Sequence, residues 1–125
     1  DPGATALHEC ASGRSWTFAE LDAASAAPPP PGVPVLFPGG NGADFLITVL
    51  RAWRHGRIVC PLDAGAAAPV FDAGALVRRF PDAVHLKTTS ATTGAARLVA
   101  FNAAQLAADA RAIVERMGLA PDAPN

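Results

Sequence analysis

The stretch VPVLFPGGNGADFLITVLRAWRHGRIVCPLD, residues 33–63, carries the strongest signal for the fold class. Its first five residues, 33–37, are mostly apolar and predict a strand, and residues 43–55 carry apolar side chains at helical spacing. Gly56 stands where that helix is expected to end, and residues 57–62 predict a second buried strand. A strand, a helix and a strand within about 30 residues form a βαβ unit, in which the two strands are parallel and the crossover is right-handed.

Short helices are predicted on both sides of this unit. Thr17 and Glu20 match a capping box at the start of a helix, and the Pro-rich connection at residues 28–32 follows it. Asp72 is suited to cap a second short helix over residues 73–80.

Two further strands and a longer helix are predicted in the last third of the chain. Residues 84–89 alternate in polarity with a period of two, and residues 97–101 regain strand character, so the segment between them is a connection. Asn102 and Gln105 form an N-terminal cap pattern for the helix. Its apolar stripe consists of Leu106, Ala110, Ile113, Val114 and Met117. We therefore predict one α/β module with a small, mostly parallel sheet flanked by helices.

The composition restricts the classes of function. The 125 residues form at most one domain, and half of them are hydrophobic while 17% are charged. Ten cationic side chains stand against eleven acidic ones, a net charge of −1, so the basic surface of a nucleic-acid-binding protein is missing. No apolar run reaches the roughly 18 residues of a membrane span, and residues 1–13 lack the features of a signal peptide. We expect a cytoplasmic protein with no nucleic-acid partner and no membrane span.

Cysteine and histidine positions do not indicate a metal site. Cys10 and Cys60 allow one disulfide at most, and we expect both thiols to be reduced. His8 lies two residues before Cys10, but no second ligand pair follows at zinc spacing. The sequence starts without Met and stops in the polar stretch PDAPN, so we expect residues 1–125 to be a segment cut from a longer protein.

Two segments of the chain are candidates for binding phosphate. The Gly-rich turn at residues 39–42 lies between a strand and a helix, where backbone N–H groups can hold an anion, but it matches neither the dinucleotide nor the Walker pattern. We interpret it as a structural turn. Residues 88–97, TTSATTGAAR, gather five hydroxyl groups within six residues and end in Arg97. Because a polyphosphate needs many donors, little steric bulk and a cation, we predict a phosphate-binding loop at 88–97.

This loop resembles the phosphate-binding signature of the adenylate-forming superfamily, which includes acyl-CoA synthetases and the adenylation domains of peptide synthetases. The usual form of that signature is TSGTTGxPK, and residues 89–97 read TSATTGAAR. Segments 15–22, 33–63 and 101–125 resemble other parts of the same family, in the same order. The resemblance implies that the chain is an incomplete part of the N-terminal domain of an adenylate-forming enzyme.

The resemblance also implies which residues bind ATP. The residues that would wrap its β- and γ-phosphates are Thr89, Ser90, Thr92, Thr93, Gly94 and Arg97, and Mg²⁺ would offset the phosphate charge. Arg97 stands at the Lys position of the signature, Ala91 at its first Gly and Ala96 at its Pro. His85 and Lys87, on the wetter face of the preceding strand, are weaker candidates for contact with nucleotide or substrate.

The implied reaction is attack of a carboxylic acid substrate on the α-phosphate of ATP, which gives an acyl-AMP and pyrophosphate. Acyl transfer to CoA or to the thiol of a carrier protein usually follows. The family's catalytic Lys and metal-binding Glu lie downstream of Asn125, so this chain is expected to contain no catalytic residue and no metal ligand, to be inactive alone, and to need the missing remainder of the enzyme as a partner. The alternative is a non-catalytic α/β binding or structural module, a degenerate relative of the family.

Overall fold

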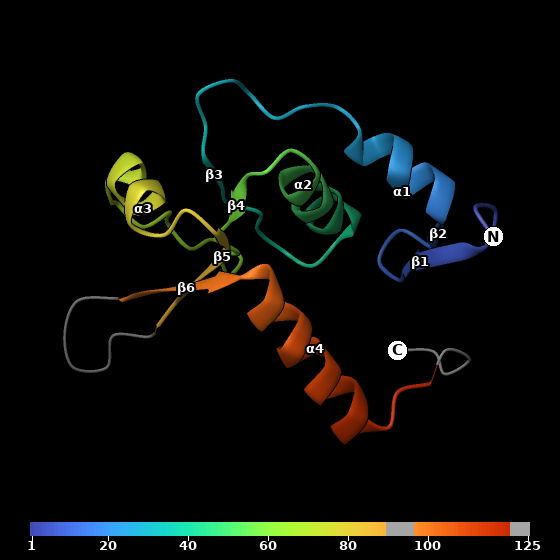
Figure 1. The fold of residues 1–125 in the computed structure, drawn as a ribbon. Coiled ribbons are helices and arrows are strands. Elements are labelled where there is room, and N and C mark those ends of the chain that lie inside the picture. Colours follow the sequence, from blue (N-terminus) through green and yellow to red (C-terminus); the bar gives the residue numbers. More distant parts are fainter. Residues whose placement is uncertain (90–96, 121–125) are drawn as a thin grey trace.

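The computed structural model describes residues 1–89 and 97–120 (Figure 1). The elements of these residues are β1 (Thr5–Glu9), β2 (Arg14–Thr17), α1 (Phe18–Ser25), β3 (Val35–Leu36), α2 (Ala43–Arg54), β4 (Ile58–Val59), α3 (Ala73–Arg79), β5 (Ala83–Thr88), β6 (Leu98–Asn102) and α4 (Ala103–Met117). The strands form a β1–β2 hairpin and a four-stranded sheet in the order β3-β4-β5-β6. The predicted α/β class is confirmed.

The prediction of a mostly parallel sheet is wrong, because the sheet is mixed. β3, β4 and β5 are parallel neighbours, but β3 and β4 are each two residues long. β5 and β6 pair antiparallel along their whole length, from Ala83 opposite Asn102 to Thr88 opposite Leu98. The chain between Thr88 and Leu98 is too short for a parallel crossover, which takes a dozen residues or more, so β6 returns antiparallel.

The β1–β2 hairpin was not predicted from the sequence. Its strands pair antiparallel with Leu7 opposite Trp16, and the register shifts between Thr5 and Leu7. Gly13 has a φ of 70°, in the left-handed region that suits a tight turn. Leu7 and Trp16 pack against the buried Leu21 of α1 and Ile47 of α2, so the hairpin covers these two helices.

The βαβ unit predicted from residues 33–63 is confirmed, and helices cover both faces of its sheet. Val59 of β4 packs against Val49 and Ala52 of α2. Ile58, its neighbour in the strand, lies on the opposite face, where Leu76 of α3 packs against the same core. α2 and α3 therefore cover opposite faces of the short sheet.

Helix starts follow the predicted caps. Thr17 N–H donates to Glu20 Oε2 (2.7 Å), and Glu20 N–H donates to Thr17 Oγ1 (3.2 Å). Asp72 accepts from the first turn of α3. Asn102 and Gln105 exchange the two hydrogen bonds of a capping box, each 2.9 Å long, at the start of α4. These local patterns form as expected because each needs only residues three positions apart.

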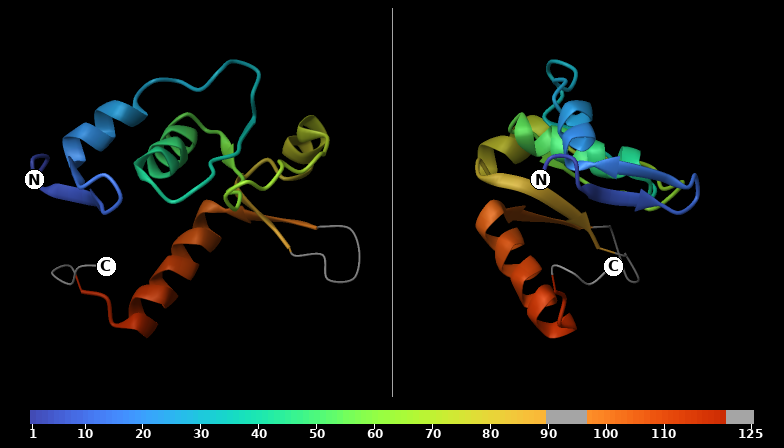
Figure 2. Two further views of the ribbon diagram at one scale, coloured as in Figure 1. Left: turned by 180° about the vertical axis from the view of Figure 1, so that it is seen from behind. Right: turned by 90° about the vertical axis from the view of Figure 1, so that its right-hand side faces the viewer.

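The last helix extends away from the rest of the molecule (Figure 2). None of its residues is buried, and Ile113, Val114 and Met117 are 48%, 45% and 67% exposed. The predicted apolar stripe of α4 is therefore present but largely uncovered by the described residues.

In the described part of the chain, no helix is both long and apolar enough to cross a membrane.

The first prediction concerns the core. Leu86 is fully buried between β4, α3 and β6, so Leu86→Ala removes packed methyl groups and should lower the free energy of unfolding by roughly 2–5 kcal/mol. Val70→Ala, at a fully exposed position, should change it by less than about 0.5 kcal/mol. Urea unfolding followed by circular dichroism measures both, and equal effects of the two substitutions would contradict this core.

Candidate functional site

The predicted phosphate-binding segment 88–97 leaves the sheet at the carboxyl end of β5 (Figure 1). β3, β4 and β5 are parallel, so the connections that follow them start from one edge of the sheet, where Gly39 and Leu62 form an isolated parallel bridge. Ligands of open α/β sheets bind outside the carboxyl ends of the strands. The segment therefore begins at the edge where such sites form.

Thr89 and Arg97 close the base of this segment. Thr89 N–H donates to the Arg97 carbonyl oxygen (2.9 Å), and Arg97 N–H donates to Thr89 Oγ1 (3.2 Å). The Thr89 hydroxyl in turn lies 3.4 Å from the Arg97 carbonyl oxygen. These bonds continue the β5–β6 ladder by one step and bring the first and last residues of the signature-like sequence together.

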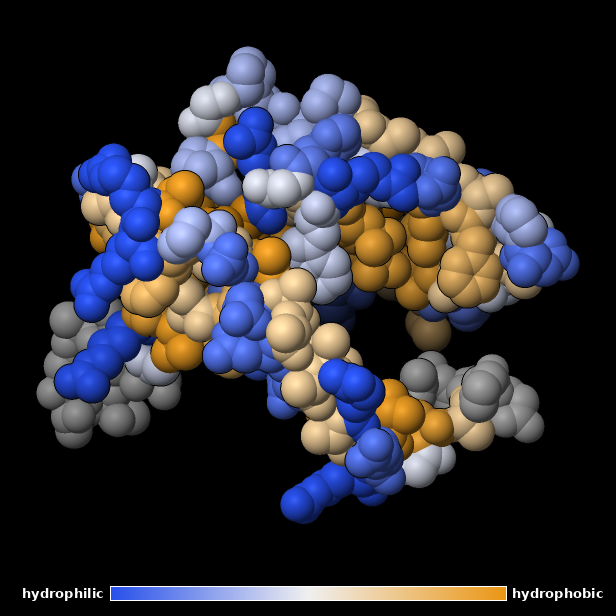
Figure 3. Space-filling view, in the orientation of Figure 1, coloured by the Kyte–Doolittle hydropathy of each residue, from blue (hydrophilic) through white to orange (hydrophobic). Residues whose placement is uncertain are grey.

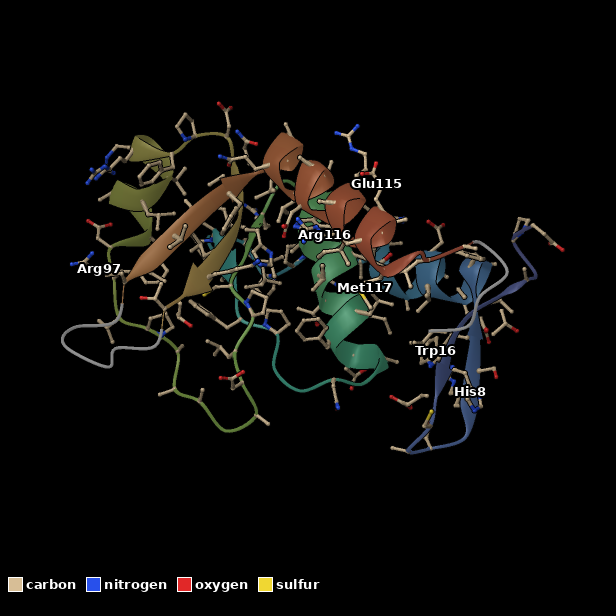
Figure 4. All side chains as sticks on the ribbon, turned by 90° about the horizontal axis from the view of Figure 1, so that it is seen from below. His8, Trp16, Arg97, Glu115, Arg116 and Met117 are labelled. Carbon is tan, nitrogen blue, oxygen red and sulfur yellow. The ribbon has the colours of Figure 1, made fainter. Side chains whose placement is uncertain are left out.

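The Arg97 side chain is exposed at this base, and Figure 4 places it far from His8 and Trp16 of the hairpin. Neither of the ion pairs found among residues 1–89 and 97–120 involves Arg97. The other predicted phosphate contacts, Ser90, Thr92, Thr93 and Gly94, lie outside the described residues, as do Ala91 and Ala96.

His85 and Lys87, the weaker candidates, both contact Phe101 of β6. Lys87 Nζ lies 5.0 Å from the Phe101 ring and 3.9 Å from Asp109 Oδ2 of α4. The His85 ring lies edge-on to the same phenyl ring, with 6.3 Å between centroids. Burial and the nearby Lys87 charge lower the pKa of His85, which favours its neutral form. These contacts give both side chains a packing role between β5, β6 and α4.

The Gly-rich turn at residues 39–42 leads to a helix end that already holds an anion. Ala43 N–H, in the first turn of α2, donates to Glu9 Oε1 (2.9 Å). Gly42 has no side chain to cap the helix, and a Cβ there would lie 2.8 Å from the same oxygen. Glu9 was not predicted as a functional residue, since nothing in the local sequence links it to a helix that starts over 30 residues later. The carboxylate supports the interpretation of residues 39–42 as a structural turn.

No metal-binding cluster is found where the chain is described: no three His, Cys, Asp or Glu side chains gather there. His8 Nδ1 lies 3.0 Å from Ser15 Oγ on the neighbouring strand. Cys10 and Cys60 are free thiols, the first exposed and the second buried. Burial raises the pKa of the Cys60 thiol.

Comparison with known proteins gives a structural match alone. No protein-family model matches the sequence, and no curated protein matches it. The crystal structure of apo MatB from Rhodopseudomonas palustris matches with a TM-score of 0.68 at 15% sequence identity, over 98% of this chain and 36% of the MatB chain. The chain thus spans little more than a third of the length of MatB. At this identity the match shows the fold alone: the chain folds like about a third of the MatB chain.

The second prediction tests Glu9. Hydrogen bonds from Ser12 and Ala43 and the charge of Arg14 lower its pKa in the folded chain. Its stabilising effect is therefore complete above the pKa of Glu in the unfolded chain, about 4.3, and is lost as the pH falls through the lower folded value. Glu9→Gln should lower the free energy of unfolding at pH 7. It should also make that free energy depend less on pH in the acid range.

Urea unfolding at pH 7 and at pH 3 measures this difference. Asp82→Asn is the matched control, because Asp82 is an exposed carboxylate without a side-chain hydrogen bond among the described residues. If Glu9→Gln and Asp82→Asn have the same effect at both pH values, Glu9 does not hold the start of α2.

Proposed function

We propose that this chain is the ATP-phosphate-binding segment of an acid-thiol ligase. Such an enzyme activates a carboxylic acid as an acyl-AMP and transfers the acyl group to CoA or to a carrier-protein thiol. One observation carries the proposal: a hydroxyl-rich segment that ends in Arg97 starts at the carboxyl edge of a sheet whose fold matches part of MatB. Fold and segment point to the same class of enzyme independently.

The role of the segment follows from its chemistry. Hydroxyl and backbone N–H donors of Ser90, Thr92, Thr93 and Gly94 are proposed to surround the β- and γ-phosphates of ATP. Arg97 presents a planar guanidinium, which can bind two phosphate oxygens at once. Donors that are already in place when pyrophosphate leaves stabilise its developing charge. Thr89 contributes by holding the base of the segment closed.

Mg²⁺ and the rest of the reaction require residues from elsewhere. When bound to ATP, Mg²⁺ neutralises charge on the phosphate oxygens. No group of three ligand side chains gathers in residues 1–89 and 97–120, so we propose that any protein ligands of the ion belong to the remainder of the enzyme. Because the chain spans 36% of MatB, we also propose that the catalytic groups belong to that remainder.

A non-catalytic α/β module is the second candidate. The Thr89 hydroxyl favours it, because that hydroxyl bonds to the backbone of Arg97 as it would in a purely structural connection. The two candidates differ in what the loss of the Arg97 charge does. If the segment binds phosphate, removing the Arg97 charge lowers the affinity for phosphate. If the segment is only a structural connection, removing the charge has no effect, because the Arg97 side chain is exposed.

The third prediction therefore concerns Arg97. Arg97→Ala should weaken binding of pyrophosphate to the chain about tenfold or more, the effect of removing a charged hydrogen-bond donor, and Arg97→Lys should retain most of it. Isothermal titration calorimetry measures the affinities. Arg78→Ala, an exposed Arg at the end of α3, is the control and should leave them unchanged. Equal affinity for the wild type and Arg97→Ala would favour the structural module.

The fourth prediction concerns turnover. In the complete enzyme, Arg97→Ala should sharply reduce the carboxylate-dependent exchange between ATP and pyrophosphate, and the 125-residue chain alone should show no such exchange. Radiolabelled pyrophosphate measures both. Robust exchange by the isolated chain would contradict the assignment of the catalytic groups to the remainder.

A further inference from the structure

We draw no further inference here: the strongest candidate, the apolar groove that the end of α2 and the start of β5 form with α4 and its hydrophobic stripe (Figure 3), carries none, because nothing in the structure shows what covers it.

Discussion

The antiparallel pairing of β5 with β6 is the constraint on which the rest of the molecule depends. It places Thr89 opposite Arg97 and so determines where segment 88–97 leaves and re-enters the sheet. It also sets the starting point and direction of α4, whose cap Asn102 is the last residue of β6. The position of the segment that we propose to bind phosphate and the direction of α4 both follow from this pairing.

Most helices and several strands could be predicted from the sequence, because their signals are local. The caps of α1, α3 and α4 each involve side chains three residues apart, and the apolar pattern of residues 33–63 is continuous. A mostly parallel sheet was predicted from that pattern, and this prediction was wrong. The direction of β6 depends on the short connection between Thr88 and Leu98, and not on the polarity pattern of the strand. The β1–β2 hairpin was missed because the residues it covers, Leu21 and Ile47, lie far along the chain.

The candidate site was predictable at its ends and not in its surroundings. Thr89 and Arg97 were named from residue type and spacing, and the structure brings them together, although their contact with phosphate remains a prediction. Glu9 could not be found in that way. Its carboxylate accepts from the start of a helix that lies far along the chain, so no local pattern connects the two.

The most direct test of the central claim is an NMR titration of the ¹⁵N-labelled chain with Mg²⁺-ATP. We expect the backbone amide signals of residues 89–97 to shift most, and those of residues 39–43 to stay in place because Glu9 already occupies the start of α2. Shifts centred on residues 39–43, or no shift in residues 89–97 at saturating nucleotide, would contradict the assignment of this segment to the phosphates of ATP.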